Sequence, residues 1–270
     1  MQPIRSSKAL EQDLSLATAY LGRIAVTPAA DLLDSPTMTI ARDGTLRVAY
    51  APFDHIARNA RIVIVGITPG RAQALNALLA ARNVTERAGH VPEALAEAKL
   101  TGSFSGPLRA NLIAMLDAIG VAKTLGVETM AEVFRPGSQD VHFTSALRYP
   151  VFVNGQNYNG APDMLKTPLL RQMVETHLAE EARMLPDALW LPLGPRPEAA
   201  LRHLAGQGLL DRKKILSGLP HPSGANAERV AVFLGRKPPE LASRQTNPAK
   251  LLSAFKVLSA QIAALKGASV

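Results

Sequence analysis

The chain has 270 residues, of which 47% are hydrophobic, and it carries a formal net charge of +8 with an isoelectric point near 10.0. A chain of this length buries enough surface to form one large core, so we expect a single domain over residues 1–270. Cys is absent, which excludes disulfides, thiolate nucleophiles and cysteine-ligated metal or iron–sulfur sites. The positive charge makes a polyanion such as nucleic acid a candidate partner.

Hydropathy along the chain argues against a membrane protein. The opening segment has polar or charged residues throughout and lacks the apolar centre of a secretory signal. No segment approaches the roughly 20 apolar residues that cross a bilayer. We therefore expect a cytoplasmic protein with no membrane partner.

Residues 1–49 are predicted to form an N-terminal extension. An amphipathic pattern favours a helix over residues 8–21, and a Pro-containing loop follows over residues 27–36. Two β-prone runs then flank Asp43-Gly44, a dipeptide that tolerates the positive φ angles of a type I′ turn. We therefore expect a β-hairpin there.

An alternation of strand and helix patterns begins at residue 61. Short apolar runs predict buried strands at residues 62–65, 141–147, 188–193 and 213–216. One helix is predicted to begin near Arg71. Further helical patterns cover residues 108–119, 165–184, 197–204, 225–234 and 248–265. This order predicts an α/β fold, namely a three-layer α/β/α arrangement with a central, mainly parallel four-stranded sheet, plus the N-terminal hairpin. Residues 238–270 form a C-terminal helical segment, and residues 154–160 form a surface turn.

A first loop, Gly66-Ile67-Thr68-Pro69-Gly70, connects the first buried strand to the helix near Arg71. Ligands of such sheets gather beyond the carboxyl ends of the strands, where this loop lies. Its glycines permit close backbone approach, and amides at the helix start could face an anion or a carbonyl oxygen. The loop lacks the Gly-Lys-Ser/Thr ending of a phosphate-binding Walker motif. A purely structural strand-to-helix turn is the alternative interpretation.

A second loop, residues 217–226, follows the last predicted strand and contains His221-Pro222-Ser223-Gly224. Two prolines restrict the backbone around His221, which favours a histidine that donates a hydrogen bond to substrate. A structural or merely exposed histidine is the alternative. The other histidines show no metal-ligand spacing, so we expect no metal site; they are His55, His90, His142, His177 and His203.

The two loops, in this order and each after a buried strand, resemble the uracil-DNA glycosylase superfamily, in which a G-x-x-P-G loop positions the hydrolytic water and an H-P-S loop faces the base. The resemblance extends to Gly102-Ser103-Phe104-Ser105-Gly106-Pro107-Leu108, to Thr144-Ser145-Ala146-Leu147 and to Leu193-Gly194. It covers roughly residues 50–237. It implies a DNA glycosylase of base-excision repair, a hydrolase that flips a damaged or deaminated base and cleaves its N-glycosidic bond without metal or cofactor.

The resemblance also implies a role for each matching residue. Thr68 would position water, His221 would stabilise the leaving base, Phe104 would stack on the base, and Ser145 would face its edge. The remaining substrate-binding candidates are Gly66, Ile67, Pro69 and Gly70 around the base, and Pro222, Ser223, Gly224 and Asn226 at the phosphates. Donors aimed at the oxygen of a departing base contribute about 3 to 4 kcal/mol.

Two residues depart from the family pattern. Thr68 stands where active relatives carry an Asp or Asn that activates water, and a threonine hydroxyl has no useful basicity near neutral pH. Ser145 replaces an Asn whose donor and acceptor read a uracil-like edge. The alternative hypothesis is therefore a non-catalytic nucleic-acid-binding member. A third interpretation treats the cleft as a small-molecule or nucleotide site. In the first two, the partner is single- or double-stranded DNA, and we expect a monomer.

Overall fold

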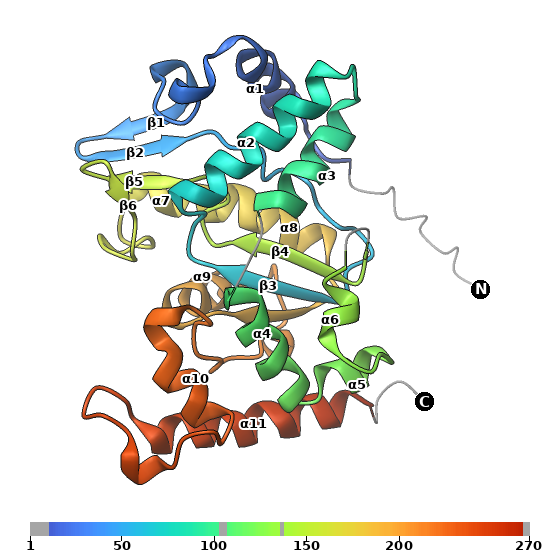
Figure 1. Ribbon diagram of the computed structural model, residues 1–270, viewed down its shortest axis with the longest axis vertical. Coiled ribbons are helices and arrows are strands. Elements are labelled where there is room, and N and C mark those ends of the chain that lie inside the picture. Colours follow the sequence, from blue (N-terminus) through green and yellow to red (C-terminus); the bar gives the residue numbers. More distant parts are fainter. Residues whose placement is uncertain (1–10, 103–106, 136–137, 267–270) are drawn as a thin grey trace.

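Two sheets form the framework of the protein. The computed structural model describes residues 11–102, 107–135 and 138–266. The central sheet is parallel and has the order β4-β3-β7, with β3 at Ile62–Gly66, β4 at Val141–Ser145 and β7 at Leu189–Pro192. The second sheet is antiparallel and has the order β1-β2-β5-β6, with strands at Thr39–Asp43, Leu46–Ala49, Val151–Val153 and Gln156–Asn157 (Figure 1). The predicted α/β class is confirmed.

The central sheet separates two apolar cores. Along β3, Val63 and Val65 pack into the first core, while Ile62 and Ile64 pack into the second. All four side chains are fully buried. A strand that is covered on both faces needs apolar residues on both, which is why this run lacks the alternation of a half-exposed strand.

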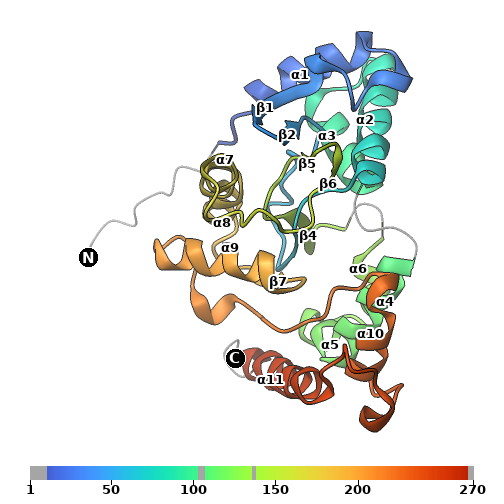
Figure 2. The ribbon, with the colours of Figure 1, turned by 90° about the vertical axis from the view of Figure 1, so that its left-hand side faces the viewer.

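Helices cover both faces of this sheet (Figures 1 and 2). The first core lies beneath the antiparallel sheet and α1 (Ser15–Val26), α2 (Arg71–Glu86), α3 (Val91–Gly102), α7 (Pro168–Met173), α8 (Ala179–Met184) and α9 (Pro195–Gly206). The second core is covered by α4 (Pro107–Ala118), α5 (Val121–Leu125), α6 (Met130–Val133), α10 (Ala227–Phe233) and α11 (Pro248–Lys266). Short 3₁₀ turns lie at Ala29–Asp31, Pro36–Met38, Arg212–Lys214, Gly224–Asn226 and Pro239–Leu241.

Most predicted helices are confirmed, with shifted ends. The pattern at residues 165–184 becomes α7 and α8 joined by a π-helical turn, Val174–Leu178. The helix predicted at residues 8–21 is confirmed over residues 15–21, because α1 begins at Ser15, and is wrong at residues 11–14, which are not helical. Residues 8–10 lie outside the described part. Helices α3, α5 and α6 were not predicted.

The fourth predicted strand is not formed as a strand. In residues 213–216, only Ile215 makes a parallel bridge, to Trp190, and the Leu216 N–H donates to the Trp190 carbonyl at 2.8 Å. The preceding residues form a 3₁₀ turn because the Asp211 side chain accepts the Lys213 N–H. The described parallel sheet therefore has three strands and a single extra bridge.

The N-terminal hairpin is confirmed, but its turn differs from the prediction. Asp43 pairs with Leu46, so Gly44 and Thr45 are the two turn residues. Only Gly44 has a positive φ, +53°, whereas a type I′ turn needs positive φ at both positions. That requirement is met instead at Asn154-Gly155, with φ values of 49° and 76°, which joins β5 to β6. The predicted surface turn at residues 154–160 thus begins as a tight hairpin.

Candidate functional site

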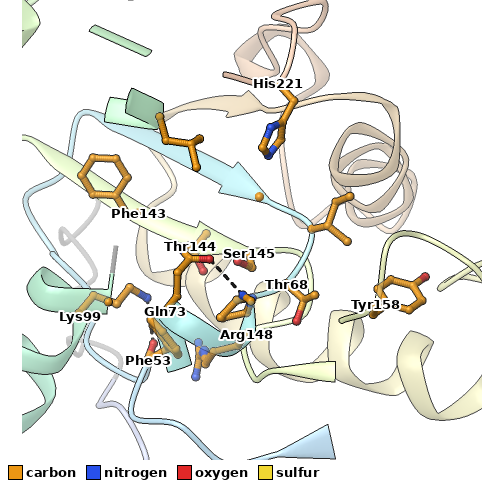
Figure 3. A pocket seen from close by; sticks show the side chains of 16 residues that line it. Phe53, Thr68, Gln73, Lys99, Phe143, Thr144, Ser145, Arg148, Tyr158 and His221 are labelled. Atoms are coloured by element: carbon orange, nitrogen blue, oxygen red, sulfur yellow. Dashed lines mark hydrogen bonds between the residues drawn. The ribbon is translucent and has the colours of Figure 1, made fainter. Parts of the chain in front are cut away.

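A cavity of about 240 Å³ opens at the carboxyl ends of β3 and β4. Its position agrees with the rule that ligands bind where parallel strands end and helices begin. Side chains reach into it from several elements, among them Gln73 on α2, Lys99 on α3 and His221 in the second loop (Figure 3). The lining residues are Phe53, Gly66, Ile67, Thr68, Pro69, Gly70, Gln73, Lys99, Gly102, Leu108, Phe143, Thr144, Ser145, Arg148, Tyr158 and His221.

The first loop, residues 66–70, forms one wall of the cavity and is held by backbone bonds. The carbonyls of Gly66 and Ile67 accept N–H bonds from Ala146 and Leu147, at 2.8 and 3.0 Å, which extends the β3–β4 ladder past the strand ends. Gly70 is the N-cap of α2, and its N–H donates to Gln73 Oε1 at 3.0 Å. The loop is therefore rigid on both sides.

The Thr68 side chain fastens this loop to the antiparallel sheet. Its hydroxyl donates to the Tyr149 carbonyl at 3.0 Å and accepts the Val151 N–H at 3.2 Å. A hydroxyl has one hydrogen and two acceptor sites, so its hydrogen is already used. Thr68 therefore lines the cavity and also joins the first loop to the start of β5.

The start of α2 has a further partner from the β5–β6 hairpin. The Arg71 N–H donates to Asn157 Oδ1 at 3.0 Å, so a side chain of the hairpin accepts one of the amides that a helix leaves unpaired at its start. Next to Asn157, Tyr158 lines the cavity, and its hydroxyl donates to the Pro162 carbonyl at 2.5 Å. The sequence analysis expected amides at this helix start to donate to an anion or a carbonyl oxygen. Those of Gly70 and Arg71 instead donate to the side chains of Gln73 and Asn157.

His221 reaches the cavity from the second loop, residues 217–226, on the opposite wall (Figure 3). The Ser223 N–H donates to His221 Nδ1 at 3.2 Å. That bond requires a lone pair on Nδ1, so a neutral ring carries its hydrogen on Nε2. Burial lowers the pKa of His221 and favours this neutral form. The ring is thereby set as a neutral hydrogen-bond donor.

The rest of the second loop supports His221 without lining the cavity. Asn111 on α4 donates from Nδ2 to the Pro222 carbonyl at 2.9 Å. Asn226 donates from Nδ2 to Ser223 Oγ at 3.1 Å. Pro222, Ser223, Gly224 and Asn226 are thus placed beside the cavity, leading into α10, while the other predicted site residues line it. Phe104 lies outside the described residues.

Several lining residues were missed by sequence reasoning, among them Phe53, Gln73, Lys99, Phe143, Thr144, Arg148 and Tyr158. Lys99 on α3 is 6% exposed and donates to the Phe53 carbonyl at 2.9 Å. Burial lowers its pKa to about 8. The one local signal that could have found Arg148 is its place just after the predicted strand end at Leu147, where ligands gather.

Arg148 belongs to a buried ion-pair cluster behind the cavity. Its guanidinium donates to Glu181 at 2.9 Å, to Glu180 at 2.8 Å and to the His177 carbonyl at 2.9 Å. Burial raises the pKa of the Glu181 carboxyl, but the neighbouring Arg148 guanidinium lowers it, and the pKa lies below its ordinary value. His142 Nε2 lies 3.3 Å from Glu181 Oε2. A buried pair of this kind keeps its charges only while both partners are present.

A second buried group adjoins this cluster. Asp54 accepts hydrogen bonds from the hydroxyls of Tyr50, at 2.9 Å, and Tyr149, at 2.5 Å. Burial, reinforced by the Asp54 carboxylate, raises the pKa of both tyrosine hydroxyls. The Tyr149 hydroxyl is therefore a neutral donor to Asp54. The backbone carbonyl of the same residue accepts the hydrogen bond from the Thr68 hydroxyl.

The described residues contain neither a metal-binding cluster nor a membrane-spanning helix. Across residues 11–102, 107–135 and 138–266, no group of three or more His, Asp or Glu side chains is arranged to hold a metal ion. Within the same ranges, no helix has the length and apolar character needed to cross a membrane.

Comparison with known proteins places the chain in a family. It is 35% identical over 211 residues to YoxB of Bacillus subtilis (strain 168), which covers 77% of this chain and 82% of YoxB. The chain belongs to the YoxB family. YoxB is described as an uncharacterized protein, so this membership transfers no activity. No family model matches the chain, and no solved structure matches it.

Proposed function

We propose that this YoxB-family protein is a DNA glycosylase-like hydrolase of the uracil-DNA glycosylase superfamily, which cleaves the N-glycosidic bond of a flipped damaged or deaminated base. One observation carries the proposal: the first loop and His221, far apart in the sequence, line one cavity at the carboxyl ends of the parallel strands. A base inside a duplex is inaccessible, so the enzyme would bind it extruded in this cavity.

The sheet supports the fold that the proposal requires. The order β4-β3-β7 is extended on the β7 side by the parallel bridge between Trp190 and Ile215. Ile215 thus occupies the place of a fourth strand, next to β7, and the second loop leaves from that place. The finer proposal is a four-stranded superfamily sheet whose last strand is reduced to one bridge in this chain.

His221 has the chemistry that the departing base needs. As the C–N bond stretches, its electron pair moves onto the base and negative charge grows on a carbonyl oxygen. A neutral donor fixed in the Nε2–H form is aimed at such charge without the cost of reorganising. Water then bonds to the sugar carbon and releases a proton to solvent, and the base anion takes up a proton from solvent.

The test is base release from single-stranded and duplex oligonucleotides that carry a panel of lesions, read as strand breaks after alkali. We expect release of at least one base by the wild-type protein and a rate about a hundredfold lower for His221→Ala. His90→Ala is the matched control, because His90 is exposed on the surface, and it should leave the rate unchanged. No release across the panel by pure, folded protein would contradict the hydrolase proposal.

The engagement of the Thr68 hydroxyl favours a second candidate, a non-catalytic DNA-binding protein on the same scaffold. A hydroxyl that holds Tyr149 and Val151 has little capacity to orient water. This candidate predicts DNA binding that weakens steeply with salt, because phosphate neutralisation releases counterions, and no base release. If no DNA binds at low salt, both DNA proposals fail and a small-molecule cavity replaces them.

Thr68→Asn separates the two DNA candidates. An amide can donate to the Tyr149 carbonyl with its NH₂ and still present its oxygen to water. Thr68→Asp lacks that donor and is the less suitable replacement. Base release gained by Thr68→Asn, from a wild-type protein that binds DNA without cleaving it, would show that only water handling had been lost.

A further inference from the structure

The end of the cavity that is lined by Lys99, Gln73 and Thr144 contains a buried cation. Lys99 extends from α3 into the cavity, near Gln73 and Thr144 (Figure 3). Its side chain is almost fully buried, and its ammonium donates to the Phe53 carbonyl at 2.9 Å. A buried ammonium is costly, so a position that keeps one in a cavity wall is a candidate for function rather than for stability.

Charged or titratable groups on several elements face Lys99. They are Glu181 on α8, Arg148 after β4, Asp54 after β2, His142 on β4 and His55 after β2. The pKa of Lys99 is lowered to about 8, because burial and, to a smaller extent, Arg148 lower it more than Glu181 and Asp54 raise it. Burial also lowers the pKa of both histidines, which leaves them neutral near pH 7. Lys99 is therefore mostly charged at neutral pH and loses its charge just above it.

Thr144 supplies a second polar group at the same end. Its side chain is buried on β4 and lines the cavity, and its Oγ1 has no hydrogen-bond partner among the described residues. A buried hydroxyl without a partner is uncommon and costs free energy, which a bound ligand would recover. Gln73 lies beside it with its oxygen already accepting the Gly70 N–H, so its NH₂ group is what remains for a ligand.

The described lining is rich in donors and contains no carboxylate. Lys99, Gln73, Thr144 and His221 present N–H or O–H groups, and no Asp or Glu is among the lining residues that the structure describes. A ligand with carbonyl oxygens satisfies such a wall, whereas an amino group facing an ammonium leaves donors opposed to donors. One mismatch of this kind changes affinity by about tenfold or more.

We propose that Lys99 and Thr144 are specificity-determining residues that bind a carbonyl oxygen of the flipped base, and that the Lys99 ammonium is also a catalytic residue that stabilises the negative charge on the base as it departs. The inference deepens the proposed function and rests on it. As the C–N bond breaks, its electron pair leaves on the base, opposite a fixed positive charge; water supplies the new bond to the sugar. A cation of this kind compensates for the weak water handling of Thr68, because a better leaving group lowers the demand on the nucleophile.

Binding tests recognition without requiring cleavage. The probes are oligonucleotides with one 2′-fluorinated nucleoside, because the fluorine opposes the oxocarbenium-like charge on the sugar and suppresses base release. Uracil is compared with cytosine, and hypoxanthine with adenine, since each pair differs by a carbonyl against an amino group. Fluorescence anisotropy at fixed salt should show that wild-type protein prefers the carbonyl member of at least one pair by about tenfold. The absence of a preference in both pairs would overturn the proposal.

The variants assign that preference to Lys99. Lys99→Gln and Lys99→Met should reduce it to about twofold or less, Lys99→Arg should retain part of it, and Thr144→Val should weaken it by a smaller factor. Lys123→Gln is the matched control, because Lys123 is an exposed lysine on α5 and its loss removes the same charge. Thermal unfolding confirms that each variant folds. A preference preserved in folded Lys99→Gln or Lys99→Met would overturn the proposal.

Single-turnover base release tests the catalytic part. The wild-type rate should fall as pH rises through about 8, because Lys99 loses its charge there, and the slower Lys99→Gln protein should not show this fall. A retained preference with no release from any cleavable substrate would contradict the hydrolase function and leave recognition supported. Normal release and an unchanged pH profile in Lys99→Gln would support the hydrolase and overturn the role of Lys99.

Discussion

The two loops that face each other across the cavity are held in different ways. The first loop, residues 66–70, is joined by Thr68 to Tyr149 and Val151, which pack in the first core. The second loop is joined to α4 of the second core by the Asn111 bond to Pro222. Opposite walls of one site thus belong to opposite faces of the sheet. The distance between the two walls, and so the size of the cavity, depends on how the two cores pack against β3.

The anchoring differs in strength as well as in location. Behind the first loop lie the buried Arg148–Glu181 pair and the Asp54 group, so several charged bonds fix that wall. The bonds at His221, Pro222 and Ser223 of the second loop are neutral, and its charged donor, Arg229 to Asn226 Oδ1 at 2.8 Å, is exposed to solvent. Removing anchors on the first side should therefore cost more than removing them on the second.

The largest effect is expected for Arg148→Met. The substitution leaves the fully buried Glu181 without its main partner, and breaking a buried pair costs about 3–5 kcal/mol. Denaturant unfolding measures the loss. Arg196→Met is the control, because its pair with Asp163 is 44% and 37% exposed, and it should cost no more than about 1 kcal/mol. Equal costs for the two variants would contradict the assigned role of the buried pair.

A smaller loss is expected for Thr68→Val, which conserves shape and removes the hydroxyl. The Tyr149 carbonyl and the Val151 N–H would both lose a partner, at a cost of about 1–3 kcal/mol. Thr85→Val on α2 is the control, since the Thr85 hydroxyl donates only to the Ala81 carbonyl of its own helix. Urea unfolding compares the two. If Thr68→Val costs no more than Thr85→Val, the tie between the first loop and β5 is not a stabilising one.

Asn111→Ala should have a weaker effect, because one neutral bond to the second loop is lost. We expect about 0.5–1.5 kcal/mol of destabilisation and faster amide exchange in residues 221–226. Asn83→Ala, at an exposed position of α2, is the control and should change neither quantity. A loss larger than that of Thr68→Val would reverse the order of the two loops.

A fourth effect, a change in stability with pH rather than with a substitution, should come from two partly buried histidines. Burial lowers the pKa of His55 and of His177 from 6.5 to about 4. Between those values the unfolded chain binds protons that the folded chain does not, so stability falls as pH decreases from about 6.5 towards 4. Thermal unfolding across this range should show the fall. Replacing both histidines with Gln should flatten it, whereas His90→Gln should not.

Local patterns in the sequence were sufficient for the class of fold and for most of two loops that meet at the cavity. The β-branched run of β3 and the helical periods around it predicted a sheet covered on both faces, because burial on both sides leaves a continuous apolar signal. The glycines and prolines of the two loops predicted rigid turns after strands. All the predicted residues of the first loop, together with Ser145 and His221, do line the cavity.

Tertiary contacts decided what fills the rest of the cavity. Lys99 is part of an ordinary amphipathic helix, and its burial depends on the packing of α3 against α2, where Gly102 leaves room beside Phe53 and Ala77. The strand at residues 213–216 failed for a local reason instead, because the Asp211 cap holds residues 212–214 in a 3₁₀ turn and leaves only Ile215 to bridge to Trp190.

The sequence by itself therefore determined most of the segments that become strand, helix and loop, since these depend largely on neighbours within a few residues. It did not determine α3, α5 and α6 or the reduced strand at residues 213–216. The three-dimensional structure decided which distant side chains meet. It ties the Thr68 hydroxyl to the backbone of Tyr149 and Val151, and it sets the His221 ring as a donor through Ser223. It also holds the ammonium of Lys99 in the cavity, because burial and charge at that point depend on elements drawn from the whole chain.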